Sequence, residues 1–349
     1  MNDEFQFTPC LNTLLLGESL TFDQSRQVFQ ALLSGKLTPA QIAGLVIALR
    51  LKGETPNEVA GAASAMRELV AAVPVDDTDR VADLCGTGGD GARTFNISTA
   101  CMFVLAACGA TVGKHGGRSV SSSSGSADVL EALGVNINLN PSQVAQCMQQ
   151  TGLGFMFAPN HHSAMRFAGP VRKELGVRTV FNVLGPLTNP AGAKRQLMGV
   201  YDKSLLSLQA EVLMQLGSSH ALIVHGANGM DELCLECETH VAELRDGQIK
   251  QYSVTPEDFG LNRQSHEALL AESVDESMAK LRLALAGQGE VIADIVALNS
   301  GAALYVSGGA SSIQEGVERS QQVMNNGQAT ARLEQFIKAT QQLGKAQYE

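Results

Sequence analysis

The chain has 349 residues, of which 44% are hydrophobic and 17% are charged, so it can bury a sizeable core and lacks the composition of a disordered protein. Its formal net charge of -10 argues against a general nucleic-acid surface, because binding to phosphate backbones needs clustered Lys and Arg. The length allows two domains, or one large α/β domain with an elaboration.

The N-terminal segment, MNDEFQFTPC, has no basic region followed by an apolar core, and no apolar run reaches the length of a membrane span. The seven cysteines are an odd number spread through apolar segments, as expected of reduced, buried thiols. We therefore expect a cytoplasmic protein without a membrane partner.

Residues 1–75 have the pattern of a purely helical unit. The tetrapeptides TPAQ at 38–41 and TPNE at 55–58 each place a Thr cap before Pro, with Gln or Glu at the third helical position, which predicts two capping boxes. Behind the second box, apolar residues from Val59 to Val73 recur at spacings of three and four and predict one buried helix face. This unit carries no catalytic pattern, so we interpret it as a lid or a dimerisation element.

From Arg80 the chain alternates strand, loop and helix, the rhythm of a largely parallel sheet with ligands at the carboxyl ends of its strands. Strands are predicted at 81–84, near 111–112, at 154–158 and at 221–225, and helices at 98–108, 127–133 and 203–216, with a further helix capped at Asn140. Residues 275–349 predict several helices and one apolar strand-like piece, without recognisable chemistry.

The predicted fold class is therefore α/β, with a small, mostly helical domain and a larger α/β domain whose central, mainly parallel sheet is flanked by helices. We place the helical domain at 1–78 and the α/β domain at 79–349. A segment near 163–195 is expected to return to the helical domain.

A glycine-rich turn, GTGGD at 86–90, directly follows the first predicted strand. Glycine lets backbone N–H groups approach an anion closely, because it has no Cβ and tolerates positive φ. Asn96, Ser98 and Thr99 then offer amide and hydroxyl groups at the positive N-terminal end of the next helix. The alternative is an ordinary tight connection, since the turn matches neither the Walker pattern nor the dinucleotide fingerprint.

A second cluster, KHGGR at 114–118, is followed by a serine-rich run that ends at Ser126. It adds fixed cations and small donors before the next predicted helix. Two anion sites of the strand–loop–helix kind within about fifty residues indicate a ligand with more than one phosphate group.

Asp231 and Glu232 are adjacent carboxylates in a glycine-rich loop after the strand at 221–225. Such a pair is either solvated or used by Mg²⁺ that is shared with phosphate oxygens, and both readings stay open. Asp90 is a third acidic candidate near the same ligand.

Three histidines and one arginine have equally open roles. His115, His161 and His162 are candidates for a general base or for structural histidines. Arg172 is either a charge on a helix surface or a clamp for a carboxylate. Its planar guanidinium is suited to bind a carboxylate through two hydrogen bonds.

Cys234, Cys237 and His240 have part of the spacing of a zinc site. We interpret 233–244 as a strand, however, in which positions three apart point to opposite faces, and no fourth ligand is evident. The sequence therefore disfavours zinc.

Together these motifs resemble the anthranilate phosphoribosyltransferase family of the tryptophan pathway. The segments that carry the resemblance occur in order over nearly the whole chain: GTGGD, NxST at 96–99, KHGxR with the serine cluster, GSADVLEALG, PVRxxLGxRTxFNxLGPLTNP at 170–190, and Asp231–Glu232. The resemblance implies transfer of the phosphoribosyl group of phosphoribosyl pyrophosphate (PRPP) to the amine of anthranilate, which gives N-(5-phosphoribosyl)anthranilate and pyrophosphate. It also implies Mg²⁺ as cofactor, a homodimer, and an active site in the hinge between the domains.

Two alternatives remain beside the transferase. One is a pyrimidine nucleoside phosphorylase, which shares the architecture, and the other is a binding paralogue with an altered acceptor.

Carried over by motif, the resemblance implies that Asp231, Glu232 and Lys114 are catalytic, and that Ser98 joins the two acids in holding Mg²⁺. Anthranilate would contact Gly86, Gly117 and Arg172. Both loops would supply the contacts to PRPP, namely Gly86, Gly89, Asp90, Thr94, Asn96, Ile97, Ser98, Thr99, Lys114, His115, Gly116, Gly117, Arg118, Ser119, Val120, Ser121, Ser122 and Ser126.

Two positions depart from the family pattern. Gly117 stands where the family has an Asn that contacts anthranilate, and Ser123 stands where the family has a basic residue. Loss of one hydrogen bond of about 1 kcal/mol would weaken anthranilate binding roughly fivefold, which alters acceptor recognition without changing the reaction.

Overall fold

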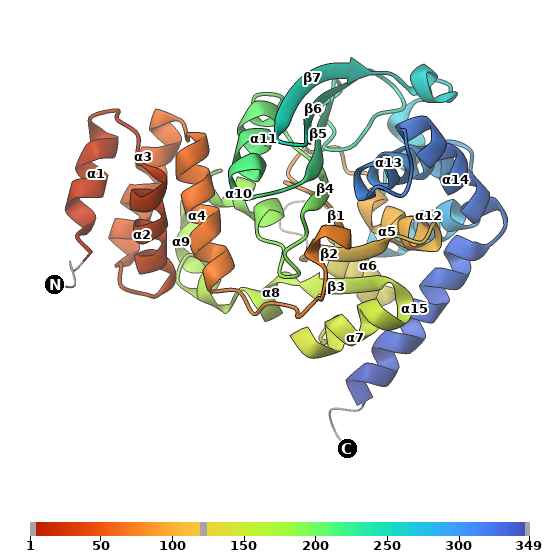
Figure 1. The fold of residues 1–349 in the computed structure, drawn as a ribbon, viewed down its shortest axis with the longest axis horizontal. Helices are drawn as coiled ribbons and strands as arrows, with labels where there is room; N and C mark the ends of the chain where they lie inside the picture. Colours follow the sequence, from red (N-terminus) through yellow and green to blue (C-terminus); the bar gives the residue numbers. More distant parts are fainter. Residues whose placement is uncertain (1–4, 119–123, 346–349) are drawn as a thin grey trace.

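The computed structural model describes residues 5–118 and 124–345, and Figure 1 shows a helical part beside a larger part centred on a sheet. The helical part begins with α1 (Phe7–Leu15), α2 (Phe22–Leu33), α3 (Pro39–Lys52) and α4 (Pro56–Glu68). Thr38 and Thr55 form both expected capping boxes, each with Pro at the start of the helix. The sequence prediction of these helix starts is confirmed.

A later segment of the chain packs into the same apolar cluster as these helices. Residues of α9 (Gly169–Leu175) and α10 (Phe181–Leu184) are buried there, and α9 packs against α3. The rings of Phe29 and Phe181 meet edge to face with centroids 5.9 Å apart. Between β3 (Leu153–Phe157) and α9 lie the short α8 (Ala158–His161) and the 3-10 turn η2 (Ser163–Arg166), and η3 (Gly185–Leu187) follows α10.

A seven-stranded sheet in the order β3-β2-β1-β4-β5-β6-β7 forms the centre of the larger part. Its first five strands are parallel, and β6 and β7 are antiparallel, so the expected mainly parallel sheet is confirmed. The strands are β1 (Val81–Gly86), β2 (Thr111–Gly116), β3 (Leu153–Phe157), β4 (Arg195–Gly199), β5 (His220–Gly226), β6 (Thr239–Arg245) and β7 (Gln248–Val254). The strand order reverses direction at β1, between β2 and β4, where open α/β sheets bind ligands.

Helices cover the sheet, and α5 lies against α13 and α15 at the centre of the main apolar core. In Figure 1 the C-terminal α15 runs past α7 along the edge of the molecule. The covering helices are α5 (Ile97–Ala107), α6 (Ser126–Ala132), α7 (Pro141–Thr151), α11 (Leu205–Gln215), α12 (Val274–Leu285), α13 (Val291–Ser307), α14 (Ile313–Asn325) and α15 (Gln328–Lys345). Short 3-10 turns are η1 (Thr78–Arg80), η4 (Pro256–Phe259) and η5 (His266–Leu269). Of the described helices, none has both the length and the apolar character needed to cross a membrane.

Two local predictions are wrong. The described part of 275–349 contains helices and no strand, because its apolar run is the buried α13, whose neighbours cover it on several sides. The proposed strand at 233–244 begins only at Thr239. Before it, the Leu233 amide donates to Oδ1 of Asn299 and the Cys234 amide to Oγ1 of Thr239, so these residues bond within a loop instead of along a strand.

The loop changes the arrangement of the two cysteines. Cys234 and Cys237 do not point to opposite faces, as expected of a strand; their Sγ atoms lie 2.8 Å apart. His240 lies in β6, where its ring contacts Ser253 and Lys203.

Candidate active site at the carboxyl ends of the parallel strands

The candidate site lies where neighbouring parallel strands end. β1 ends at Gly86, β2 at Gly116, β4 at Gly199 and β5 at Gly226. Because these strands are parallel, their following loops lie at one edge of the sheet. The glycine turn, the KHGGR segment and the loop with Asp231 and Glu232 therefore meet there.

The glycine turn after β1 has a backbone that favours anion contact. Gly88, Gly89 and Gly91 all have positive φ, at 63°, 75° and 75°. Such conformations turn consecutive N–H groups toward one concavity. Arg178 holds the turn from outside, since its guanidinium stacks over Tyr201 at 4.0 Å and donates to the Gly89 carbonyl.

Asp231 reaches the glycine turn from the loop after β5. Its Oδ2 accepts a hydrogen bond from the Gly88 amide at 2.9 Å, and its own amide donates to Oδ2 of Asp90 at 3.3 Å. A Cβ at Gly86 would lie 2.2 Å from Oδ2 of Asp231, and one at Gly199 would lie 1.6 Å from the Asp231 carbonyl oxygen. Glycine at Gly86 makes room for the carboxylate of Asp231, and glycine at Gly199 makes room for its backbone.

The two adjacent carboxylates are held in an environment that disfavours their charge. Burial, with the carboxylate of Asp90, raises the pKa of Asp231 to about 7. Burial and the neighbouring Asp231 raise the pKa of Glu232 to about 8, although Lys114 acts in the opposite direction. The backbone of Ser98 lies close enough to Glu232 to act in the same direction as Lys114 on the pKa of this carboxyl. The structure thus brings Ser98, Asp231 and Glu232 together.

These residues fit a hard divalent cation. Ser98 offers a hydroxyl and the two acids offer carboxylate oxygens, which is the donor set that Mg²⁺ prefers. A cation would offset the burial and the mutual repulsion that raise both pKa values. Within 5–118 and 124–345, no group of three or more His, Cys, Asp or Glu side chains is placed to hold a metal. A Mg²⁺ ion here would therefore take its remaining oxygens from phosphate and water.

Lys114 lies inside the sheet edge and is only 1% exposed. Its Nζ donates to the Leu84 carbonyl at 2.5 Å and to Oγ of Ser98 at 3.2 Å. Asp83 is equally buried, and Lys114 opposes the rise that burial causes in the pKa of this carboxyl. Lys114 thus places a fixed positive charge between the strand ends and the candidate metal ligands.

Side chains at the start of α5 organise the neighbouring loops. Oδ1 of Asn96 accepts from Oγ of Ser124 at 2.8 Å and from Oγ of Ser277 at 2.7 Å. Oγ1 of Thr99 donates to Oγ of Ser126 at 3.0 Å, which ties the starts of α5 and α6 together.

Two further members of the predicted donor set bond or pack within the protein. Thr94 forms an isolated β-bridge with Leu270, and the side chain of Ile97 belongs to the apolar core.

The KHGGR segment is partly engaged by protein groups. Arg118 forms ion pairs with Asp128 at 2.8 Å and Glu131 at 2.9 Å. A Cβ at Gly116 would lie 3.1 Å from the ring of Phe155, whereas one at Gly117 would meet nothing within 4 Å. The predicted contacts Ser119, Val120, Ser121 and Ser122 lie outside the described residues, as does Ser123.

Arg172 is a half-buried cation on α9. Its guanidinium lies over the ring of Phe181 at 5.4 Å, and burial lowers its pKa. Among the described residues it has no ion-pair partner, in contrast to Arg118. It is therefore free to receive a carboxylate from a ligand.

The three histidines separate into a pair and a single residue. His115 and His162 meet through their Nε2 atoms, 3.2 Å apart, while Nδ1 of His161 contacts the Ala71 carbonyl at 2.7 Å. Of the three, only His115 in β2 and His162 just after α8 have their rings together.

Sequence reasoning did not assign a role to several residues that shape the site. Arg178 fixes the glycine turn, Asp83 lies beside Lys114, and Oγ1 of Thr87 accepts from the Tyr201 amide at 3.1 Å. A signal for Arg178 was present, since it is the second arginine of the motif at 170–190 that also contains Arg172.

Comparison with known proteins gives consistent matches. The family model described as "Glycosyl transferase family, a/b domain" matches residues 78–330, and that described as "Glycosyl transferase family, helical bundle domain" matches residues 8–70. The chain is 53% identical to anthranilate phosphoribosyltransferase of Methylibium petroleiphilum over 96% of this chain and 98% of the relative. It is 49% identical to the enzyme of the same name from Neisseria gonorrhoeae, over 95% and 97% of the two chains.

Solved structures agree with these relatives. The crystal structure of anthranilate phosphoribosyltransferase from Thermus thermophilus has a TM-score of 0.90 at 43% identity and covers 95% of this chain and 99% of its own. The enzyme of Saccharomyces cerevisiae in complex with PRPP and Mg has a TM-score of 0.88 at 26% identity, over 96% and 98% of the chains. The yeast enzyme in complex with 4-fluoroanthranilate has a TM-score of 0.86 at 25% identity over the same shares.

Proposed function

The chain belongs to the anthranilate phosphoribosyltransferase family, and on that premise we propose how its own residues carry out the reaction. The enzyme transfers the phosphoribosyl group of PRPP to the amine of anthranilate, a step of tryptophan biosynthesis. A nucleoside phosphorylase or a binding paralogue is not favoured, because relatives that match nearly the whole chain carry the transferase name.

One observation carries the proposed donor site: Ser98, Asp231 and Glu232 gather beside the positive-φ glycine turn at the ends of the parallel strands. We place the PRPP phosphates along this turn, the start of α5 and the segment from Lys114 to Ser126. Ser98, Asp231 and Glu232 would hold Mg²⁺, which when bound neutralises charge on the pyrophosphate oxygens. The yeast relative with PRPP and Mg supports this choice of ligands.

The chain's own residues mainly position charge. The glycine turn and the N-terminus of α5 orient the donor, and the buried ammonium of Lys114 provides a positive field as pyrophosphate departs with the bonding electrons. The aromatic amine attacks the anomeric carbon from the opposite face, without a covalent enzyme intermediate. Movement of the helical part toward the sheet would align the two substrates and exclude water.

Arg172 is the proposed clamp for the anthranilate carboxylate. It is half-buried, cationic and unpaired among the described residues, and it lies on α9, which packs with the helical part. A planar guanidinium binds a carboxylate through two parallel hydrogen bonds. Gly86 and Gly117 would border the aromatic ring from the sheet side.

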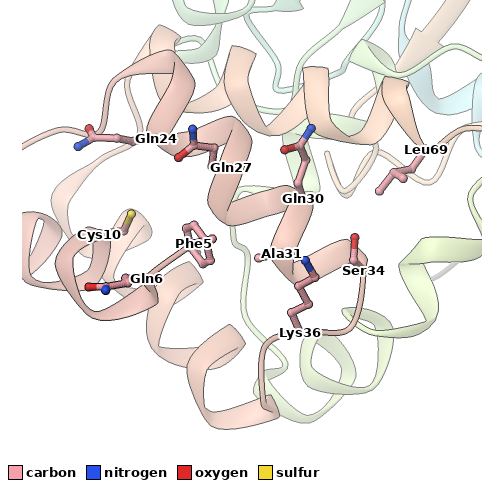
Figure 2. A pocket seen from close by; sticks show the side chains of 10 residues that line it. All are labelled: Phe5, Gln6, Cys10, Gln24, Gln27, Gln30, Ala31, Ser34, Lys36 and Leu69. Atoms are coloured by element: carbon pink, nitrogen blue, oxygen red, sulfur yellow. The ribbon is translucent and has the colours of Figure 1, made fainter. Parts of the chain in front are cut away.

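We further propose a homodimer that associates through the helical part. Leu15 and Leu16 at the end of α1 are 69% and 77% exposed, and Leu51 at the end of α3 is 82% exposed. A cavity of about 750 Å³ lies beside α1 and α2, and its lining includes Cys10 and Gln27 (Figure 2); a second copy would partly cover it. Light scattering should report a dimer for the wild type, and a Leu16→Lys, Leu51→Lys variant should shift toward monomer; an unchanged mass would contradict this surface.

The domain division and the location follow from the same premise. We propose that 1–78 and 79–349 are the domains, with a segment near 163–195 returning to the first, and the gap between the two matched family models, at residues 70 and 78, supports the boundary. Unpaired cysteines support a reducing, cytoplasmic location.

A direct assay tests the function. Anthranilate fluorescence should fall when the enzyme is mixed with PRPP and Mg²⁺, and omission of either should stop the reaction. A parallel reaction with a pyrimidine nucleoside and phosphate should show no turnover. Nucleoside cleavage without anthranilate consumption would overturn the assignment.

A further inference from the structure

Ser277 connects the C-terminal part of the chain to the start of α5. It lies near the start of α12, which packs against both α5 and α6, and its side chain is fully buried. Its Oγ accepts a hydrogen bond from the backbone N–H of Asn96 at 3.0 Å and donates one to Oδ1 of Asn96 at 2.7 Å. No chemistry was recognisable in the sequence at 275–349, yet this hydroxyl bonds a residue of the proposed donor site.

The partners of Ser277 and Asn96 fix the direction of each hydrogen bond. A backbone N–H can only donate, so Oγ of Ser277 accepts from it, and the single hydroxyl hydrogen of Ser277 is directed to Oδ1 of Asn96. Nδ2 of Asn96 lies 3.2 Å from the carbonyl oxygen of Ser124, which can only accept. The side-chain amide of Asn96 therefore has one orientation.

Both lone pairs of the Asn96 side-chain oxygen are occupied. Besides the hydroxyl of Ser277, the hydroxyl of Ser124 donates to Oδ1 at 2.8 Å. Ser124 is buried and lies two positions before α6 begins. Asn96 thus joins three segments: α12, the start of α5, and the end of the serine-rich run that precedes α6.

These hydroxyls prevent Asn96 from capping its own helix. Asn96 is the N-cap residue of α5, and Asn in this position usually accepts a hydrogen bond from an amide of the first turn. The side chain of Asn96 makes no such bond. By contrast, Asn140 at the start of α7 accepts from the amide of Gln143 at 3.0 Å. The same residue type therefore caps one helix and is held away from the cap of the other.

We propose that Ser277 is a positioning residue for PRPP. It holds the side chain of Asn96 away from the cap of α5, so that the positive first turn of this helix stays open to the donor phosphates. Through Asn96 it also fixes Ser124, at the end of the segment assigned to the same phosphates. Because Ser277 is fully buried, it acts through Asn96 and not by touching the substrate. The inference rests on the proposed function and deepens it.

Ser277→Ala should weaken the binding of PRPP. Without the hydroxyl, Oδ1 of Asn96 loses one of its two donors, so the amide can rotate, cap α5 and compete with a phosphate. The KM for PRPP should rise roughly fivefold to 25-fold, because one or two hydrogen bonds are lost and each corresponds to roughly fivefold in affinity. The kcat and the KM for anthranilate should stay within about twofold of the wild type, since no reacting group changes.

Ser320→Ala is the matched control. Ser320 is a fully buried helical serine whose Oγ donates to the Gly316 carbonyl at 2.8 Å within α14. Both variants lose a buried hydroxyl and should melt at a lower temperature, but only Ser277→Ala should raise the KM for PRPP. Ser277→Cys keeps the side-chain volume and forms weaker hydrogen bonds, so it carries the same kinetic test if the Ala variant does not fold. An equal rise in Ser320→Ala would assign the effect to general destabilisation and overturn the inference.

Two further measurements separate positioning from a merely structural role. A crystal structure of Ser277→Ala, or of Ser277→Cys in its place, should show Oδ1 of Asn96 accepting from an amide of the first turn of α5. In kinetics, adding Ser277→Ala to Asn96→Ala should change the KM for PRPP at most about twofold, because the connecting side chain is already absent.

An unchanged KM for PRPP in the Ser277 variants, full additivity with Asn96→Ala, or Asn96 in its wild-type orientation would overturn the inference. Failure of the wild type to consume anthranilate would instead overturn the proposed function. The crystal structure would still decide whether Ser277 controls the orientation of Asn96.

Discussion

The amide of Gly88 donates a hydrogen bond to Oδ2 of Asp231 over 2.9 Å, so the glycine turn and the acidic loop meet across a sequence separation of 143 positions. The first loop is the proposed phosphate cradle, and the second carries the proposed Mg²⁺ ligands. Because this bond and that from the Asp231 amide to Asp90 join them, we expect a change in either loop to alter the position of the other. The donor site and the metal site are therefore one structural unit.

Gly86→Ala should damage this unit without replacing any charged group. The added Cβ would lie 2.2 Å from Oδ2 of Asp231, so the carboxylate or the turn must move. We expect kcat/KM for PRPP to fall at least about tenfold, because a misplaced positioning group costs on this order or more. Steady-state kinetics at saturating anthranilate measures the effect.

The control for this change is Gly44→Ala on α3, where a new Cβ meets nothing within 4 Å and φ is not positive. It should leave kcat/KM for PRPP at the wild-type value. Equal kinetics for Gly86→Ala and Gly44→Ala would contradict the close approach of Asp231.

Replacing Asp231 and Glu232 by Ala should abolish most turnover. The change removes both carboxylates proposed to hold Mg²⁺, and loss of such charge stabilisation costs roughly 100-fold or more in kcat. The residual rate should no longer depend on Mg²⁺ concentration. A variant that keeps the wild-type rate and Mg²⁺ dependence would remove these residues from the metal site.

The stability of the metal-free enzyme should fall as pH rises from about 4 to 8. In this window the folded protein retains protons on carboxyls with pKa values of about 7 for Asp231 and about 8 for Glu232, whereas the unfolded chain has lost them near its ordinary values of about 4. The folded state therefore binds more protons, and the free energy of unfolding decreases with rising pH. Added Mg²⁺ should raise Tm most at pH 8, where it no longer competes with these protons.

Thermal melts from pH 5 to 8.5, with EDTA or Mg²⁺, measure this dependence. An Asp231→Asn, Glu232→Gln variant separates these two groups from the other titrating residues, because it should flatten the decline in EDTA and lose the gain from Mg²⁺. The same pH slope in the wild type and this variant would show that the two carboxyls are not the source.

Local signals explain which features the sequence predicted. The capping boxes at Thr38 and Thr55 depend on residues within one helical turn, and they form as expected. The prediction of a strand through Cys234 is wrong. The amide of Cys234 donates a hydrogen bond to the side chain of Thr239, and the amide of Leu233 donates one to the side chain of the distant Asn299. No short window of sequence contains that contact.

The same distinction applies to the candidate site. Asp231 was recognisable as a candidate because it stands next to Glu232 in a glycine-rich loop, but its approach to Gly88 depends on the order of the strands. His115 and His162 are 47 positions apart, and their contact arises only when β2 and β3 pair.

Arg172→Ala should chiefly raise the KM for anthranilate. The guanidinium is half-buried and has no ion-pair partner among the described residues, so its removal would cost a charge-assisted hydrogen bond. Such a bond contributes about 1.5–3 kcal/mol, which corresponds to a rise in KM of roughly 10-fold to 100-fold. The KM for PRPP should change little, and the exposed neighbour Lys173, replaced by Ala, serves as control. An effect confined to PRPP would exclude the clamp.

Gly117→Asn should strengthen anthranilate binding. A Cβ at this position meets nothing within 4 Å, and φ is not positive, so the backbone accepts a side chain without strain. An added hydrogen bond of about 1 kcal/mol to the acceptor would lower its KM roughly fivefold. Gly117→Ala is the matched control, since it fills the same first atom without an amide and should leave the KM near the wild-type value. If Gly117→Ala and Gly117→Asn lower the KM equally, the stronger binding comes from backbone order or packing. A side-chain hydrogen bond from position 117 to anthranilate would then be excluded.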